Sequence, residues 1–122
     1  MDLYSIKTIK ELFRKHKTTP KERLGQNFLL EKRVASKMLK AAEISEEDIV
    51  LEIGPGIGTL TKELAHNAKK VIAIEKDHAM VEILKETTKD LGNIEIRQGD
   101  ILVLGETREL LVYAGIGQGG VE

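Results

Sequence analysis

Residues 49–58 read Ile-Val-Leu-Glu-Ile-Gly-Pro-Gly-Ile-Gly, an apolar run that passes directly into a glycine-rich loop. A run of about five apolar residues has the length of a buried strand. After the loop, Leu60, Leu64 and Ala68 recur with the spacing of a helix. Glycines between a strand and a helix keep the turn tight and let a ligand approach the backbone. The stretch therefore predicts a strand–loop–helix unit with a ligand site at its loop.

The same apolar pattern recurs twice downstream. A second run occupies residues 71–74 and ends at Glu75, and a third, with alternating Ile94 and Ile96, ends at Asp100. Short apolar strands that alternate with helices indicate an α/β fold built on a parallel sheet covered by helices on both faces. We therefore expect about three parallel strands with flanking helices.

Three helices are predicted around these strands. One follows the second strand, begins at an N-cap Asp77, carries Leu91 near its end and finishes at Gly92 as its C′ residue. The other two cover residues 5–16 and about 31–42. Their apolar faces consist of Ile6, Ile9 and Phe13 in the first, and of Val34, Met38 and Ala42, with Ala35 and Leu39 beside them, in the second.

Composition narrows the class of protein. The 122 residues fit one domain and include no cysteine, which excludes disulfides and thiolate metal sites. No apolar run approaches the ~20 residues of a membrane span, and the first residues do not form a secretory signal. We therefore expect a cytoplasmic protein without a metal or a membrane partner.

The formal net charge of −1 conceals an uneven distribution along the chain. Residues 1–40 hold 11 lysines and arginines against 4 acids, whereas residues 41–122 hold 8 against 16. A basic segment of this kind favours the phosphate backbone of a nucleic acid. The alternative interpretation is a solvated surface whose charges happen to cluster.

Three features stand at the carboxyl ends of the three predicted strands. They are the loop that begins at Gly54, the acid Glu75 that follows 21 residues later, and Asp100 after a further 25. An acid after the second strand can accept hydrogen bonds from both hydroxyls of a ribose, and one after the third suits an adenine amine. Each feature alone also fits a plain turn or a helix cap, but together they indicate a nucleoside site.

The loop favours S-adenosylmethionine over a dinucleotide. In the dinucleotide motif G-x-G-x-x-G a third glycine would stand where this chain has Thr59. Glu52 beside the loop would repel a pyrophosphate and suit a cationic ligand. An NAD-dependent oxidoreductase fragment is therefore the less favoured alternative.

Four segments together resemble the ribosomal RNA adenine N6,N6-dimethyltransferase family: residues 24–29 (Leu-Gly-Gln-Asn-Phe-Leu), 50–58, 71–77 and 98–100. The resemblance covers roughly residues 5–102. It implies a Rossmann-like methyltransferase fold, here incomplete, and S-adenosylmethionine-dependent dimethylation of adenine N6 in small-subunit ribosomal RNA. It also gives the basic N-terminal helix and arm (residues 1–30) a role in contacting that RNA.

The resemblance assigns individual cofactor-binding residues. Asn27 and Leu29 match positions that close over the methionine end of the cofactor, and Gly54 matches the loop glycine beneath it. Glu75 matches the acid that binds the ribose, and Asp100 the residue at the adenine amine. Without the family, Asn27 reads as a turn residue and Leu29 as part of the core.

The chain departs from the family after Asp100. Family members hold the target adenine with an Asn-Leu-Pro-Tyr motif that follows the fourth strand, but here no Asn or Pro occurs after Asp100. We therefore expect residues 31–102 to be the first half of the cofactor domain and residues 103–122 to be a divergent, frame-shifted or disordered tail. No catalytic residue is assigned, and the chain is expected to bind cofactor without transferring a methyl group. A non-catalytic remnant that binds RNA or a partner is the alternative.

Overall fold

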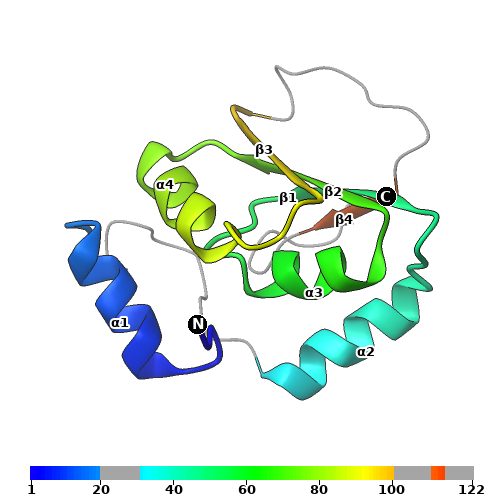
Figure 1. Ribbon diagram of the computed structural model, residues 1–122, viewed down its shortest axis with the longest axis horizontal. Helices are drawn as coiled ribbons and strands as arrows, with labels where there is room; N and C mark the ends of the chain where they lie inside the picture. Colours follow the sequence, from blue (N-terminus) through cyan, green and yellow to red (C-terminus); the bar gives the residue numbers. More distant parts are fainter. Residues whose placement is uncertain (20–30, 101–110, 115–122) are drawn as a thin grey trace.

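The computed structural model describes residues 1–19 and 31–100, together with the backbone of residues 111–114 (Figure 1). The described helices and strands are, in chain order, α1 (Ile6–Lys15), α2 (Lys32–Ala42), β1 (Ile49–Ile53), α3 (Thr59–Asn67), β2 (Lys70–Glu75), α4 (His78–Thr87), β3 (Ile94–Gln98) and β4 (Leu111–Ala114). The α/β class and the predicted strands are confirmed.

The strands form one parallel sheet in the order β3-β2-β1-β4. The fourth strand was not expected from the sequence: it pairs with β1 in a register that runs from Val50↔Leu111 to Ile53↔Ala114. With four residues, this strand is shorter than an average strand, and no amphipathic helix precedes it in the sequence. The alternation of strands and helices therefore does not predict a strand at this position. Pairing with β1 is what defines β4 as a strand.

The described helices gather on one side of the sheet. Both β1–α3–β2 and β2–α4–β3 are crossovers between parallel neighbours, and their common right-handedness places α3 and α4 on the same face. There Val50 and Val71 pack against Leu60 and Leu64 of α3.

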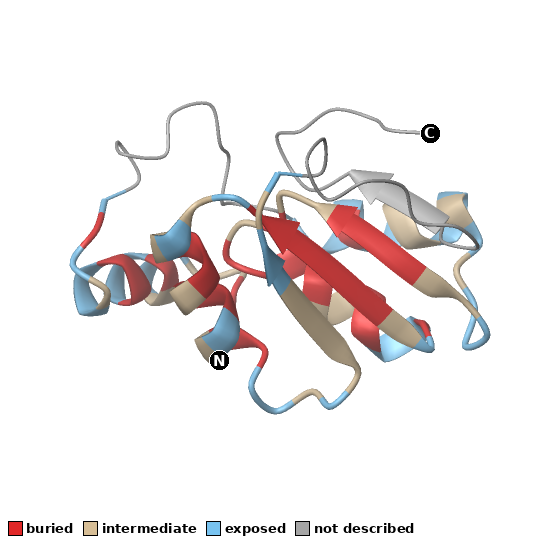
Figure 2. Ribbon diagram, turned by 90° about the horizontal axis from the view of Figure 1, so that it is seen from above, coloured by how far each residue is buried: buried red, intermediate tan, exposed pale blue. Residues whose placement is uncertain are grey.

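The opposite face carries a separate cluster of strand side chains, namely Leu51, Ile72 and Ile74 with Ile49. Figure 2 looks onto the sheet from above, the side away from α2 and α3 in Figure 1. Helices on both faces were predicted, and the described helices cover one of these faces.

The predicted span of helix α1 is confirmed, but the set of side chains that it buries differs from the predicted set. Ser5 caps it by accepting a hydrogen bond from the Thr8 amide at 3.3 Å. The buried residues are Ile9, Leu12 and Phe13, which pack on α4, whereas Ile6 is 56% exposed. The apolar stripe is wide, and the position of α4 decides which part of it is covered.

Helix α2 shows the same kind of shift. Ala35 is fully buried against α3 and the sheet, with Met38 and Leu39 packed at the edge of that cluster. Val34, predicted to lie on the inner face, is 39% exposed. Because side chains spaced by three and four both lie near one face, the sequence alone does not choose between adjacent stripes.

Helix α4 begins as predicted and ends earlier. Asp77 is its N-cap and accepts from the amides of Ala79 and Met80 at 2.9 and 3.2 Å. The helix stops at Thr87, so the predicted ending at Leu91 and Gly92 is wrong. The hydroxyl of Thr88 donates to the Leu84 carbonyl at 2.7 Å, a local bond that competes with a further helical turn.

Candidate functional site

The carboxyl ends of all four strands meet at one edge of the sheet. Gly54 follows β1, Glu75 is the last residue of β2, and Asp100 comes two residues after β3. The strand order changes direction at β1, with β2 and β3 on one side and β4 on the other (Figure 1). Ligands of open α/β sheets bind outside the carboxyl ends of the strands at such a switch point.

The glycine loop adopts a backbone that other residues rarely take. Gly54, Gly56 and Gly58 have φ angles of +69°, +60° and +94°. The amide of Gly54 donates to the Ile74 carbonyl at 2.9 Å, which ties the start of the loop to the end of β2. This conformation needs glycine because a Cβ atom disfavours positive φ. The loop is therefore a turn with a defined backbone conformation rather than a flexible linker.

Helix α4 supports the loop from behind. A Cβ on Gly58 would lie 2.8 Å from Leu84 Cδ1 and 2.8 Å from Thr87 Oγ1, closer than real Cβ contacts. The same Thr87 hydroxyl donates to the Ile57 carbonyl at 2.7 Å. Gly58 is thus required both by its φ angle and by the close approach of α4. The sequence pattern predicts only the first requirement, the positive φ angle, and not the close approach of α4.

Glu75 presents a buried carboxylate beside this loop. Its side chain is 2% exposed, and its Oε2 accepts from the Asp77 amide at 2.9 Å. Among the described residues, no group donates a hydrogen bond to Oε1, although that atom is also buried. Burial, and to a lesser extent the charge of Asp77, raise the pKa of Glu75, while the amides of Asp77, Lys76 and Gly56 act in the opposite direction. The carboxylate therefore holds an unused acceptor at the predicted ligand edge.

Glu52 is also buried, and its position differs from the expected one. It is fully inaccessible and accepts a hydrogen bond from the Thr61 hydroxyl of α3, while its Oε2 has no donor in the part of the chain that the structure describes. Burial, with a smaller contribution from the charge of Glu75, raises its pKa to about 7 despite the Thr61 bond. The sequence places Glu52 beside the loop, but the structure directs it beneath α3. Thr61, its partner, was missed, because nothing in the helix pattern distinguishes that threonine.

The predicted site residues fall into two groups. Gly54 and Glu75 are brought together at the loop, and Asp100 lies at the same edge, exposed, one residue after Gly99. The Gly99 amide donates to the Glu75 carbonyl at 3.0 Å, which links the end of β3 to the end of β2. Asn27 and Leu29 lie outside the described residues.

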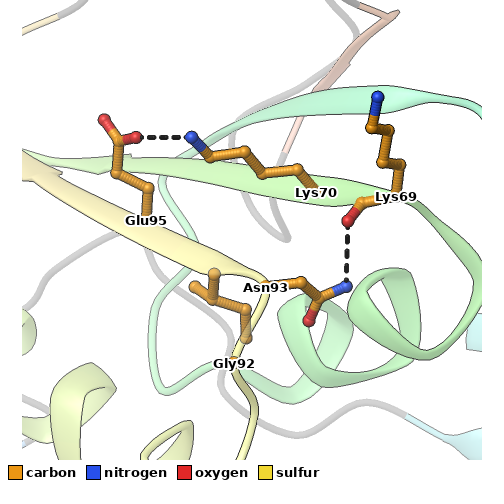
Figure 3. A pocket seen from close by; sticks show the side chains of 6 residues that line it. Lys69, Lys70, Gly92, Asn93 and Glu95 are labelled. Carbon is orange, nitrogen blue, oxygen red and sulfur yellow. Dashed lines mark hydrogen bonds and ion pairs between the residues drawn. The ribbon is translucent and has the colours of Figure 1, made fainter.

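A hollow at the opposite edge of the sheet is not part of this site. Figure 3 shows it beneath the start of β2 and β3. Its polar groups bind one another: Lys70 pairs with Glu95 at 2.8 Å, and Asn93 donates to the Lys69 carbonyl at 3.5 Å. At this hollow the charges of Lys70 and Glu95 are therefore paired with each other.

The described residues contain neither a membrane-spanning helix nor a cluster of metal ligands. Within residues 1–19 and 31–100, no helix has the length and apolar character needed to cross a membrane. Over the same residues, no three potential ligand side chains are grouped so that they could hold a metal ion.

An open parallel sheet whose strand order reverses at β1, a glycine loop after its first strand and an acid after its second are typical of nucleoside-binding α/β proteins. Comparison with known proteins identifies the family within this class. The profile of the family "Ribosomal RNA adenine dimethylase" matches residues 17–115, and the chain belongs to this family. The match extends past residue 102, the predicted end of the cofactor domain, and includes β4.

Individual relatives agree with the family. The chain is 43% identical over 104 residues to ribosomal RNA small subunit methyltransferase A of Natranaerobius thermophilus, covering 85% of this chain and 34% of that protein. The structure is similar to a dimethyladenosine transferase from Plasmodium falciparum, with a TM-score of 0.64, 35% identity and coverage of 70% of this chain and 32% of the other.

A third similar structure is an RNA methyltransferase from Salinibacter ruber in complex with S-adenosyl-L-homocysteine. Its TM-score is 0.61 at 28% identity, over 70% of this chain and 58% of that one. These likenesses confirm the methyltransferase type of fold. The chain spans about a third of the length of the curated relatives it matches.

Proposed function

We propose that the carboxyl edge of the sheet binds S-adenosylmethionine, and that the chain is the cofactor-binding portion of a small-subunit ribosomal RNA adenine N6-dimethyltransferase. The observation that carries this proposal is Glu75: a buried carboxylate with an unused acceptor oxygen beside a loop of positive-φ glycines. Family membership and the relative solved with S-adenosyl-L-homocysteine support it.

Each site residue has a proposed task. Glu75 accepts hydrogen bonds from the ribose hydroxyls, and Gly54 lets the cofactor approach the backbone. Asp100 accepts from the adenine amine, while Asn27 and Leu29 close over the methionine end. When bound, S-adenosylmethionine supplies an electrophilic methyl group on its sulfonium. The residues of this chain bind and orient that group.

Methyl transfer itself needs a second set of groups. A target adenine has to leave its stack and be held with its N6 amine in line with the methyl group. Directly after β4 the chain reads Gly115-Ile116-Gly117-Gln118, without the Asn, Pro and aromatic residue implied by the family resemblance. We therefore propose that this chain binds the cofactor and does not turn it over. A radiolabelled-methyl assay on unmethylated small-subunit RNA should give background counts.

Ribosomal RNA is the proposed partner, contacted through the basic N-terminal region, and the cytoplasm is the corresponding location. Cationic side chains on the solvent-facing sides of two helices support this: Lys7, Lys10 and Arg14 on α1, and Lys32, Arg33, Lys37 and Lys40 on α2. Binding through phosphates should weaken steeply with salt. The Lys10→Glu/Arg14→Glu double variant should weaken RNA binding, whereas Lys85→Glu on α4 should change it little. Equal effects of both variants would contradict an interface on α1.

Calorimetry tests the cofactor site directly. The full chain should bind S-adenosylhomocysteine and not NAD. Glu75→Gln should weaken that binding about 10- to 100-fold, because bonds to a charged acceptor contribute roughly 1.5–3 kcal/mol. Glu95→Gln at the amino edge is the matched control and should stay within about twofold. Tight binding of NAD without S-adenosylhomocysteine would overturn the proposal.

A further inference from the structure

Glu52 and Glu75 are two buried acids on one face of the sheet. In the register of β1 and β2, Glu52 lies opposite Ala73, so Glu75 is two residues further along the neighbouring strand. Side chains alternate along a strand, and both carboxyls therefore lie on the side covered by α3. They are 0% and 2% exposed.

Neither acid has a counter-charge among the residues that the structure describes. Among the described residues, no lysine, arginine or histidine forms an ion pair with either carboxyl, and each acid keeps one buried oxygen without a protein donor. The ionisable groups of α3, namely Lys62, Glu63 and His66, line a separate hollow beside the N-terminal segment. Two adjacent negative charges that are buried without a partner are strongly unfavourable, and one proton on the pair removes the conflict.

The surroundings of the two acids are unequal. Glu75 has the backbone amides of Asp77, Lys76 and Gly56 nearby, and such donors stabilise an ionised carboxylate. The negative charge of Asp77 acts against them, but it contributes less than the Asp77 amide does. Glu52 has a single hydroxyl, from Thr61. A hydroxyl can donate to a carboxylate or accept from a protonated acid, so Thr61 tolerates either state of Glu52. The proton therefore belongs on Glu52.

We propose that Glu52 and Glu75 hold one proton between them, that this proton resides on Glu52, and that Glu52 is thereby a positioning residue that leaves Glu75 as the ionised acceptor for a ribose. The identity of that ligand rests on the proposed function. The location of the proton is a property of the protein alone.

Carbon-13 NMR titration of the glutamate side-chain carboxyls in the ligand-free full chain tests the location of the proton. Glu52 should titrate near pH 7, the value that burial gives it, and Glu75 should titrate at lower pH. In Glu75→Gln the midpoint of Glu52 should fall, because the neighbouring charge is gone. In Glu52→Gln the midpoint of Glu75 should stay unchanged, because Glu52 is still neutral when Glu75 ionises.

Thr61→Val supplies the matched control for the hydroxyl. It keeps the shape of the side chain and removes the donor, so it should raise the midpoint of Glu52 further. Titration of Glu52 below about pH 5, near the value of an unperturbed glutamate, would overturn the proposal. So would the reverse pattern, in which Glu75 titrates near neutral pH and shifts in Glu52→Gln.

Binding of S-adenosylhomocysteine separates this inference from the proposed function. At pH 6 the Glu52→Gln variant, which imitates the protonated acid, should bind within about twofold of the unchanged chain, because Glu52 is neutral in both. A folded Glu52→Gln variant that loses binding would overturn the positioning role. If neither protein binds, the proposed function fails, and the titration still decides where the proton lies.

Discussion

At the amino edge of the sheet Lys70 pairs with Glu95 at 2.8 Å, whereas at the carboxyl edge Glu52 and Glu75 each keep a buried oxygen that has no hydrogen-bond partner among the described residues. The pKa of Glu95 is accordingly held below its ordinary value by Lys70 and Arg97, while burial raises the pKa of both acids at the other edge. The same strands thus begin at an edge where Glu95 is paired with cations and end at an edge where two buried acids have no ion pair among the described residues. Unsatisfied buried groups are where a ligand is expected.

The largest expected effect lies in the loop of the carboxyl edge. Gly58→Ala should destabilise the fold by about 2–4 kcal/mol, because it combines a positive φ with an overpacked contact against α4. Urea unfolding followed by circular dichroism measures the change. Gly92→Ala at the amino edge is the control, with no atom within 4 Å of the added Cβ, and should stay within about 0.5 kcal/mol. Equal losses for both would mean that α4 does not constrain the loop.

Removing the buried charge of Glu52 should stabilise the protein in a pH-dependent way. The folded pKa of about 7 lies above the ordinary 4.5, so ionisation in the folded state is penalised as pH rises between these values. The unchanged chain should therefore lose stability up to about pH 7 and level off above it. Glu52→Gln should be more stable by about 3 kcal/mol at pH 8 and nearly equal at pH 4.5. A difference that stays constant from pH 5 to pH 8 in urea unfolding would contradict the buried charge.

A smaller loss of stability is expected when the hydrogen bonds of Asn93 at the amino edge are removed. The Asn93 amide donates to the carbonyls of Ala65 and Ala68 at 2.8 and 3.2 Å, at the end of α3. Asn93→Ala leaves both carbonyls without this donor and should destabilise by about 1–2 kcal/mol. The control Asn67→Ala removes an exposed bond to the Glu63 carbonyl and should have less effect in the same urea series. If both variants lose the same free energy of unfolding, the hydrogen bonds from Asn93 to the end of α3 do not contribute to stability.

The smallest effect is expected at Glu95 itself. Its pairs with Lys70 and Arg97 lower its pKa, so its contribution is present at neutral pH and is lost as pH falls through that lowered value. Because the pair is partly exposed, Glu95→Gln should destabilise by only about 0.5 kcal/mol at pH 7, and less in high salt. The sign is opposite to that of Glu52→Gln. A gain in stability for Glu95→Gln would remove the contrast between the two edges.

Local patterns predicted much of the fold. The three apolar runs became β1, β2 and β3, and Asp77 caps α4 as its residue type suggests. These predictions succeed because strand burial and helix capping depend on residues within a few positions of each other. The predicted inner positions of Ile6 and Val34 failed, since both are exposed where the neighbouring helix does not cover them. The strand β4 was missed because its evidence is the pairing with β1.

The sequence by itself determined the order of the helices and of the first three strands, the glycine loop, the acid that ends β2 and the membership of a methyltransferase family. Only the tertiary structure decided that Thr87 reaches the carbonyl of Ile57 and that Thr61 donates to Glu52. It also decided that two acids from neighbouring strands are buried together with unpartnered oxygens. The physical reason is that burial and hydrogen-bond satisfaction depend on what other segments bring to a side chain. A linear pattern records the side chain and not those neighbours.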